Sequence, residues 1–372
     1  MSYEIIKEIK TSKIIVIKVG SNILVDRNQN IRKEWLQYLA KDIKKIRDQK
    51  NKVVVVSSGA IALGKKTLGK KNLNNLPDKQ AAASIGQIHL SQSWQFALSK
   101  MKIQSSQILL TAEDLENRRK YLNARNTIFA LLDLGVVPII NENDTTSTEE
   151  IRFGDNDKLS AIIANSISAE ILILLSDVNG LYTTDPKKNK NSKLLTRITV
   201  INKTIENYAN ETMSSFGSGG MLAKIEAAKL CMQSDIKMVI ANGLKKNSLK
   251  YINSENATWF IPQKKIRSRR HQWIWSRSTK IGVLHIDGGA AKALFKNSSL
   301  LAIGVKKIEG KFFRGDTISI KYNLKEVARG IINYDFEDID AIKGKRSSSI
   351  NSVLGFIRED EIIHKDNLVL IS

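Results

Sequence analysis

Cysteine and histidine are scarce in this chain. Its single cysteine, Cys231, stands alone among 372 residues, so no disulfide can form within the chain. A lone thiol is not a metal site by itself, and free cysteines are usually small buried residues, which is the role expected for Cys231. The chain has four histidines. None lies in the polar motifs described below, so those motifs contain no histidine base.

Long apolar runs are also missing. The run at residues 171–175 is bounded by Glu170 and Asp177, whereas a membrane-spanning helix needs about 20 apolar residues. The first ten residues carry charges throughout and hold no apolar signal-peptide core. We therefore expect a cytoplasmic protein with no membrane segment.

Acidic residues are fewer than basic residues in this chain. Lys and Arg total 59 against 37 Asp and Glu, which gives a formal net charge of +22. Such an excess would suit a nucleic-acid partner, because basic side chains neutralise phosphates. The alternative is composition alone: the chain is rich in Lys, Ile and Asn, as an AT-rich genome would impose on any protein, and we prefer this interpretation. Hydrophobic residues at 42% and charged residues at 26% exclude a disordered polymer, and the length predicts one large domain and one smaller one.

The first two thirds of the chain predict an α/β fold. Nearly continuous Val, Ile and Leu runs, typical of strands buried on both faces of a parallel sheet, occur at residues 14–19, 53–56, 136–140, 171–175 and 238–241. Helical patterns, such as Trp35, Leu39, Ile43 and Ile46, alternate with them. In such a sheet, ligands bind beyond the carboxyl ends of the strands.

The last third follows a different pattern. Residues 261–280 contain no carboxylate and hold Lys264, Lys265, Arg267, Arg269, Arg270, Arg277 and Lys280. We predict domains at 1–260 and 281–372, joined by a basic junction at 261–280. Short β-type runs separated by glycines, at 281–286, 300–305, 317–320, 327–332 and 367–371, predict a small, mostly β barrel or sandwich.

Polar and glycine-rich residues follow the predicted strands. Lys18 lies in the first strand, before Gly20 and Ser21, and must either reach the sheet edge or meet an anion. Ser57, Ser58 and Gly59 follow the second strand and either bind an anion or cap the next helix.

Two acid- and amide-rich loops come next, at residues 141–144 and 154–157. So many acids and amides beside a sheet are costly unless they hold cations or a polar ligand, although Asp155 or Asn156 would also cap a helix.

A glycine-rich loop at residues 216–220 enters a predicted helix, with Lys224 about one turn inside. It is either a phosphate loop or a flexible linker, and it is not a Walker A loop. Together with Lys18, the acidic loops and the turn at 176–186, it forms a set suited to phosphoryl transfer. Lysines would spread phosphate charge, and Mg²⁺ would bridge phosphate oxygens. A carboxylate acceptor fits the absence of a base, because it is already ionised at neutral pH.

The ordered motifs K-V-G-S, S-S-G-A-I-A, N-E-N-D, G-D-N-D, S-D-x-x-G-L-Y-T-x-D-P and G-S-G-G-M-x-x-K resemble those of the amino acid kinase family. Within that family the order is similar to that of the glutamate 5-kinases, over residues 13–243, and the tail resembles a PUA domain. The resemblance implies a three-layer α/β/α fold with a mainly parallel sheet. It also implies ATP-dependent phosphorylation of the γ-carboxylate of L-glutamate, with Mg²⁺, as the first step of proline biosynthesis.

The resemblance also assigns residues. Lys18 and Lys224 would stabilise the transferring phosphoryl group, with Asp157 holding both lysines. Glutamate would be bound by Ser58, Asp144 and Asn156. ATP would be bound by Lys18, Ser176, Asp177, Ser218, Gly219, Gly220, Met221, Leu222, Ala223 and Lys224. No protein ligand is assigned to the metal, which the ATP phosphates would hold.

Expected partners follow from the same resemblance: L-glutamate, ATP, further copies of the chain in a dimer or tetramer, and glutamyl phosphate reductase, with feedback by proline. Two alternatives stay open. One is a kinase of another small acid, such as acetylglutamate, aspartate, carbamate or a nucleoside monophosphate. The other is an RNA-binding protein, in which Trp259, Trp273 and Trp275 stack on bases beside the arginines of the junction.

Overall fold

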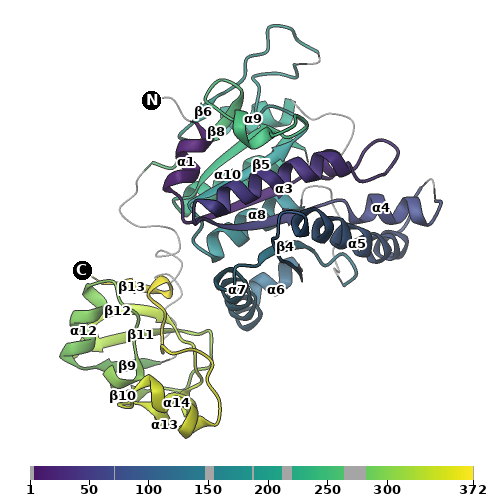
Figure 1. Ribbon diagram of the computed structural model, residues 1–372. Coiled ribbons are helices and arrows are strands. Elements are labelled where there is room, and N and C mark those ends of the chain that lie inside the picture. Colours follow the sequence, from purple (N-terminus) through teal and green to yellow (C-terminus); the bar gives the residue numbers. More distant parts are fainter. Residues whose placement is uncertain are drawn as a thin grey trace. The chain divides into compact units, whose positions relative to one another are not determined.

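The structure is a computed structural model that describes residues 4–70, 72–146, 155–186, 188–211, 220–263 and 282–371 (Figure 1). The chain divides into two compact units. The first comprises Met1–Glu116 and Asn123–Lys264, and the second comprises Asn117–Leu122 and Lys265–Ser372. Most of the basic junction, including Trp273, Trp275 and Arg267, lies outside the described residues.

An eight-stranded sheet in the order β3-β4-β2-β1-β5-β7-β8-β6 forms the centre of the first unit. Among the described strands, every ladder of this sheet is parallel except that between β7 and β8. The strands are β1 (Ile14–Val19), β2 (Lys52–Ser57), β3 (Ser105–Leu110), β4 (Val137–Glu142), β5 (Ile171–Ser176), β6 (Arg197–Ile198), β7 (Lys237–Asn242) and β8 (Ala257–Phe260). The helices are α1 (Ile5–Thr11), α2 (Ser21–Leu24), α3 (Lys33–Asp48), α4 (Ala60–Thr67), α5 (Leu76–Ser99), α6 (Ala112–Glu116), α7 (Arg118–Asp133), α8 (Asp155–Ser166), α9 (Lys203–Glu211), α10 (Met221–Gln233) and the 3₁₀ helix η1 (Ser248–Tyr251).

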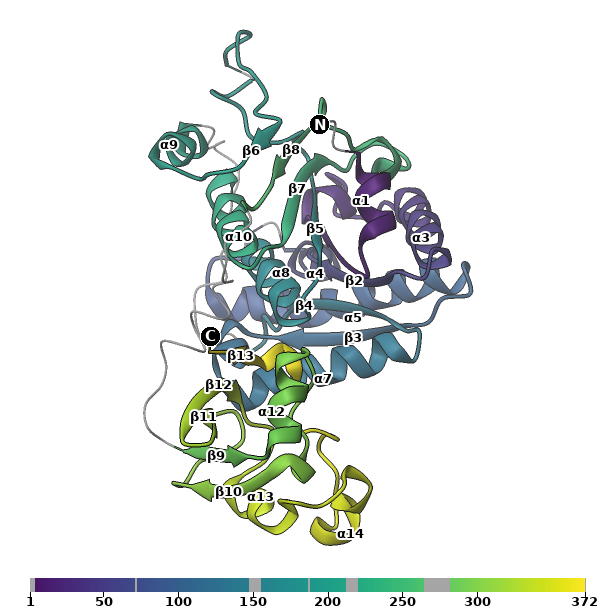
Figure 2. The ribbon, with the colours of Figure 1, turned by 90° about the vertical axis from the view of Figure 1, so that its left-hand side faces the viewer.

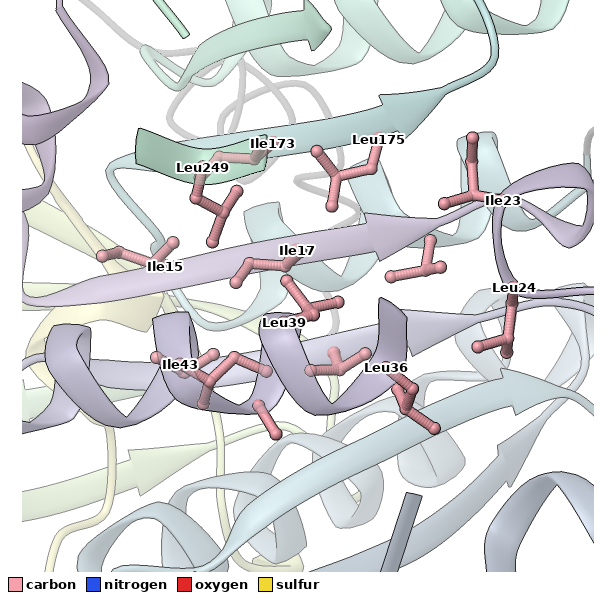
Figure 3. Close-up of a cluster of buried hydrophobic side chains, with 14 of the residues drawn as sticks. Ile15, Ile17, Ile23, Leu24, Leu36, Leu39, Ile43, Ile173, Leu175 and Leu249 are labelled. Carbon is pink, nitrogen blue, oxygen red and sulfur yellow. The ribbon is translucent and has the colours of Figure 1, made fainter. Parts of the chain in front are cut away.

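Two hydrophobic clusters cover the two faces of this sheet, because successive residues of a strand point to opposite faces. Ile15 and Ile17 of β1 pack with Leu36, Leu39 and Ile43 of α3 (Figure 3). The intervening residue of β1, Val16, packs in the other cluster with residues of α8 and α10. Helices α1 and α3 thus lie on one side of the sheet, and α8 and α10 on the other (Figure 2). This three-layer arrangement confirms the predicted fold class.

All five strands predicted for this part of the chain are present, as β1, β2, β4, β5 and β7. Three strands, β3, β6 and β8, were not predicted, and β6 has only two residues. Strand β3 begins with Ser105, Ser106 and Gln107 and is half exposed at the edge of the sheet, so it lacks the apolar run of a central strand. Strand β8 has four residues, too few for a pattern to stand out.

The second unit contains a five-stranded mixed sheet in the order β10-β9-β11-β12-β13, whose β9–β11 ladder is parallel. Its elements are β9 (Val283–Ile286), α12 (Gly288–Phe295), η2 (Ala302–Gly304), β10 (Val305–Glu309), β11 (Thr317–Tyr322), β12 (Lys325–Ile331), α13 (Phe336–Ile342), η3 (Ser347–Ser349), α14 (Ile350–Leu354), η4 (Lys365–Asn367) and β13 (Leu368–Leu370). The strand predicted at 300–305 is wrong. Gly304 ends a turn of 3₁₀ helix there, where a Cβ would lie 2.5 Å from Ala290 Cβ, and the strand begins only at Val305.

No helix within the described ranges is long and apolar enough to cross a membrane.

Helices α4 and α5 touch through glycines. A Cβ on Gly64 would lie 1.7 Å from the carbonyl oxygen of Ala82, and one on Gly86 would lie 1.8 Å from that of Ala60. These neighbours are backbone atoms, which cannot rotate away as a side chain would. The contact therefore fixes α5 against the first turn of α4, directly after Ser58.

Replacing Gly86 with alanine is expected to destabilise the first unit. Alanine gains about 1 kcal/mol of helix propensity, but the overlap with Ala60 outweighs that gain, and we expect a net loss of about 2 kcal/mol. Urea unfolding measures it. Ser84→Ala on the exposed side of the same helix is the control, and equal stability of the two variants would contradict the close contact.

Candidate functional site

One buried carboxylate holds two lysines at the carboxyl end of β1. Lys18 Nζ lies 2.5 Å from Asp157 Oδ1, and Lys224 Nζ lies 2.9 Å from Asp157 Oδ2. The Asp157 side chain is 1% exposed, that of Lys18 8% and that of Lys224 14%. Lys18 therefore meets an anion and does not extend to solvent at the sheet edge.

The alternation of side chains along β1 explains why Lys18 reaches Asp157. Lys18 follows Val16 by two residues, so it points to the face covered by α8 and α10. Asp157 lies in the first turn of α8, and Lys224 lies one turn inside α10. These three elements, far apart in sequence, bring the three charges together.

Burial and charge oppose each other in this triad. Burial alone raises the pKa of Asp157, but the charges of Lys18 and Lys224 outweigh it, so the pKa of that carboxyl lies below its usual value. Burial lowers the pKa of Lys18, the charge of Asp157 raises it, and the charge of Lys224 lowers it; the net direction is down. Two cations thus share one anion, and an incoming phosphate would reduce the excess positive charge.

Glycines leave space around the lysines. A Cβ added to Gly20 would lie 3.8 Å from Lys18 Nζ and 3.4 Å from the carbonyl oxygen of Leu175. Gly220 precedes the first turn of α10, and no side chain among the described residues caps that turn, so the leading N–H groups of α10 can donate to a ligand. Of the predicted phosphate loop, Ser218 and Gly219 lie outside the described residues. Met221, Leu222 and Ala223 form the first turn of α10.

A second cluster lies beside the triad, at the ends of β2 and β4. Asn156 Nδ2 donates to Ser58 Oγ at 2.8 Å and to Asn141 Oδ1 at 2.9 Å. The amide of Asn156 thus reaches across to two strands and does not cap its own helix. Its Oδ1 is buried and has no hydrogen-bond partner among the described residues. A buried acceptor of this kind is costly unless a ligand donates to it.

The two serines after β2 differ in role. Ser57 is fully buried and accepts a hydrogen bond of 2.8 Å from Trp94 Nε1, so it is part of the core. Ser58 faces Asn156, and neither serine caps α4, whose N-cap is Gly59 with φ of 117°. Asp144 lies half-buried in the turn after β4.

A third cluster follows β5. Asp177 accepts hydrogen bonds from Ser176 Oγ at 3.3 Å and from Asn22 Nδ2 at 3.2 Å. Asn22 lies on α2, directly after the Lys18 strand, so this cluster continues the same edge of the sheet. The structure therefore brings Lys18, Asp157 and Lys224 into contact, and separately pairs Ser58 with Asn156 and Ser176 with Asp177.

Three site residues were not singled out from the sequence. Asn22 directly follows the K-V-G-S motif and Asn141 begins the N-E-N-D motif, and their position after a predicted strand could have identified them. Gln87 accepts a hydrogen bond of 2.8 Å from Asn141 Nδ2, but it lies in the middle of α5, where no local pattern signals it.

The donor set fits a metal carried in on a ligand. In the described ranges, no three His, Cys, Asp or Glu side chains are grouped as a metal site would need. Both oxygens of Asp157 face lysine ammonium groups. A magnesium ion would thus take its oxygens mainly from bound phosphates.

Two further sequence expectations, on Cys231 and Trp259, can be compared with the structure. Cys231 is buried, and burial raises the pKa of its thiol, as expected of an inert core residue. Trp259 is fully buried in β8 and donates from Nε1 to the carbonyl oxygen of Asn253 at 2.9 Å, so it cannot stack on a base.

Comparison with known proteins identifies the family of the chain. The sequence pattern of the amino acid kinase family matches residues 13–242. The chain belongs to the amino acid kinase family. It is a kinase, and the pattern of the PUA domain matches residues 282–354.

Curated relatives match nearly the whole chain. The glutamate 5-kinase of Pelagibacter ubique is 48% identical over 365 residues, covering 97% of this chain and 99% of that protein. The glutamate 5-kinase of Paramagnetospirillum magneticum is 43% identical, with 96% and 98% covered. Among solved structures, a UMP kinase from Ureaplasma parvum covers 67% of this chain and 98% of its own, with 20% identity and a TM-score of 0.47.

Replacing Asp157 with asparagine is expected to lower the free energy of unfolding by about 3 kcal/mol, because two buried ammonium groups lose their counter-charge. The deficit should shrink as the pH rises toward the ordinary lysine pKa of about 10.4. Without Asp157 the pKa of Lys18 falls further, and a lysine with a depressed folded-state pKa regains stability as pH rises through that pKa.

Urea unfolding at several pH values measures this effect. The matched control is Asp48→Asn, which breaks a surface pair with Lys44 at 2.9 Å and should cost less than about 0.5 kcal/mol. A deficit that does not change with pH would contradict the coupling of the triad.

Proposed function

We propose that the protein transfers the γ-phosphoryl group of ATP to the γ-carboxylate of L-glutamate, giving L-glutamyl 5-phosphate and ADP. The observation that carries the proposal is the pair of ammonium groups held by Asp157 at the carboxyl edge of the sheet. A carboxylate acceptor needs charge neutralisation and positioning, and no general base. The glutamate 5-kinases that match almost the full chain support the choice of acid.

The residues divide into three roles under this proposal. Lys18 and Lys224 stabilise the charge on the transferring phosphoryl group, and Asp157 positions both. Glutamate is bound by Ser58, Asp144 and Asn156. Asn156 Oδ1, which has no partner among the described residues, accepts from the substrate ammonium. ATP is bound by Ser176, Asp177 and the segment from Ser218 to Lys224.

The transfer is a single displacement. A γ-carboxylate oxygen of glutamate forms a bond to the γ-phosphorus, and the bond from that phosphorus to the β,γ-bridging oxygen breaks, leaving ADP. Magnesium supplies further neutralisation of phosphate charge when bound with ATP. The lysines hold the phosphate oxygens in position. Their positive charge reduces the electrostatic repulsion between the glutamate carboxylate and the phosphate.

The domain division is part of the proposal. Residues 1–260 carry the kinase site, residues 261–280 form the basic junction, and residues 281–372 form the PUA-like domain. The product would serve as the first intermediate of proline biosynthesis, since an acyl phosphate is activated for reduction.

The test is an acyl-phosphate assay. Purified protein with Mg-ATP, L-glutamate and hydroxylamine should release ADP and form the hydroxamate in equal amounts. Aspartate and N-acetylglutamate, run beside it, should give little. Hydroxamate formed from one of these acids and not from glutamate would show that glutamate is not the substrate. ADP release without hydroxamate would show that the phosphoryl acceptor is not a carboxylate.

Each lysine of the triad is expected to contribute strongly to turnover. Lys18→Ala and Lys224→Ala should each lower kcat about 100-fold, the usual effect of removing one electrostatic stabiliser. Lys229→Ala is the control: it lies on the same helix and pairs with Glu206 and Glu226 at the surface. A kcat unchanged in either triad variant would remove that lysine from the mechanism.

A further inference from the structure

A row of amide side chains leads away from the proposed glutamate site. Asn156 Nδ2 donates to Asn141 Oδ1 at 2.9 Å, and Asn141 Nδ2 donates to Gln87 Oε1 at 2.8 Å. Gln87 Nε2 then donates to Gln107 Oε1 and to Ser91 Oγ, both at 3.2 Å. The row runs from α8 through β4 and α5 to the edge strand β3.

The direction of these bonds determines what Asn156 offers a ligand. An amide group has a donor nitrogen and an acceptor oxygen. Both donor positions of Asn156 are taken, by Ser58 Oγ and by Asn141 Oδ1. Its Oδ1 is left buried without a described partner, so the ligand meets an acceptor.

Ser58 alone cannot set this direction, because a hydroxyl both donates and accepts. Asn141 sets it by presenting its oxygen to Asn156, and Asn141 is 2% exposed, with its amide nitrogen toward Gln87. Turning Asn141 over would place its oxygen against Gln87 Oε1, which is an unfavourable contact between two acceptors.

Gln87 is held firmly in its place. The preceding residue, Gly86, approaches the carbonyl oxygen of Ala60 so closely that a Cβ would lie 1.8 Å from it. The Gln87 amide is fixed at its other end by Gln107 and Ser91, which also bond each other. The helix contact therefore places the Gln87 side chain beside Asn141, and its Nε2 is engaged by Gln107 and Ser91, so Oε1 is the atom that accepts from Asn141.

We propose that Gln87 is a positioning residue for the substrate ammonium: through Asn141 it turns the Asn156 amide so that Oδ1 faces the bound amino acid. The inference rests on the proposed function and deepens it. It explains the recognition of the substrate ammonium group by the direction in which the hydrogen bonds of this row run. It also predicts that glutarate, which lacks that group, is a poor substrate.

Three variants test the proposal. Gln87→Leu keeps the size of the side chain and removes its acceptor, so the KM for L-glutamate should rise about tenfold, with kcat and the KM for ATP changed less than about twofold. Gln87→Glu keeps an acceptor for Asn141, and its second carboxylate oxygen can accept from the Ser91 hydroxyl and from a turned Gln107 amide, so the KM should return to within about threefold of the wild type. Gln95→Leu, the same change at an exposed position of α5, should have no effect.

The pattern among the variants decides the outcome. Equal KM values for the wild type and Gln87→Leu would overturn the proposal. An increase in Gln87→Glu as large as that in Gln87→Leu would also overturn it, because the acceptor would then not be the feature that matters.

A second readout needs no substrate and separates this proposal from the proposed reaction. In protein labelled with ¹⁵N-asparagine, the side-chain signal that disappears in Asn156→Asp belongs to Asn156. Its two protons should exchange with solvent about tenfold faster in Gln87→Leu than in the wild type, and at the wild-type rate in Gln87→Glu. Unchanged exchange in Gln87→Leu would contradict the positioning role of Gln87, whether or not glutamate is the substrate. If the wild type is inactive on glutamate but the exchange rates are as expected, the proposed reaction is wrong and the positioning role of Gln87 stands.

Discussion

The structure of the site depends on burying two lysines with a single carboxylate. Removing an ammonium group from water is costly, and one aspartate cannot neutralise two of them. The remaining charge is tolerated because α8 and α10 pack against the same face of β1 and hold the three groups within 3 Å of their partners. The triad therefore carries a net positive charge in a largely dry position, which a phosphate would neutralise. Under the proposed function, the binding of a phosphorylated ligand and the stability of the fold depend on the same arrangement.

The position of Lys18 follows from the alternation of side chains along β1. In β1, Ile15 and Ile17 on one face fill the core beneath α3 (Figure 3). The residue that continues the other face beyond Val16 is Lys18. A shift of one residue in the β1 register would place the lysine under α3, among aliphatic side chains and away from Asp157. The apolar residues of β1 thus specify the position of the lysine as much as its own charge does.

The sequence predicted the parts of the fold that are governed by local pattern. The central strands have long apolar runs because both of their faces are buried, and all five were found. Three other strands could not be predicted. The edge strand β3 is half polar, and β6 and β8 are too short to show a hydrophobic pattern. Among site residues, those following a strand were identifiable from type and place. Gln87 was not, because its role depends on how closely α5 approaches α4, and that distance is a tertiary quantity set by Gly64 and Gly86.

The first turn of α8 links the two halves of the site. Asn156 and Asp157 are consecutive, so their side chains leave the helix about 100° apart. One reaches the amide cluster at β2 and β4, and the other reaches the lysines of β1 and α10. Any rotation of α8 that improved one set of contacts would break the other. Under the proposed function, Asn156 Oδ1 and the lysine ammonium groups are therefore held at one fixed separation, and this rigidity is what an in-line transfer between two bound ligands requires.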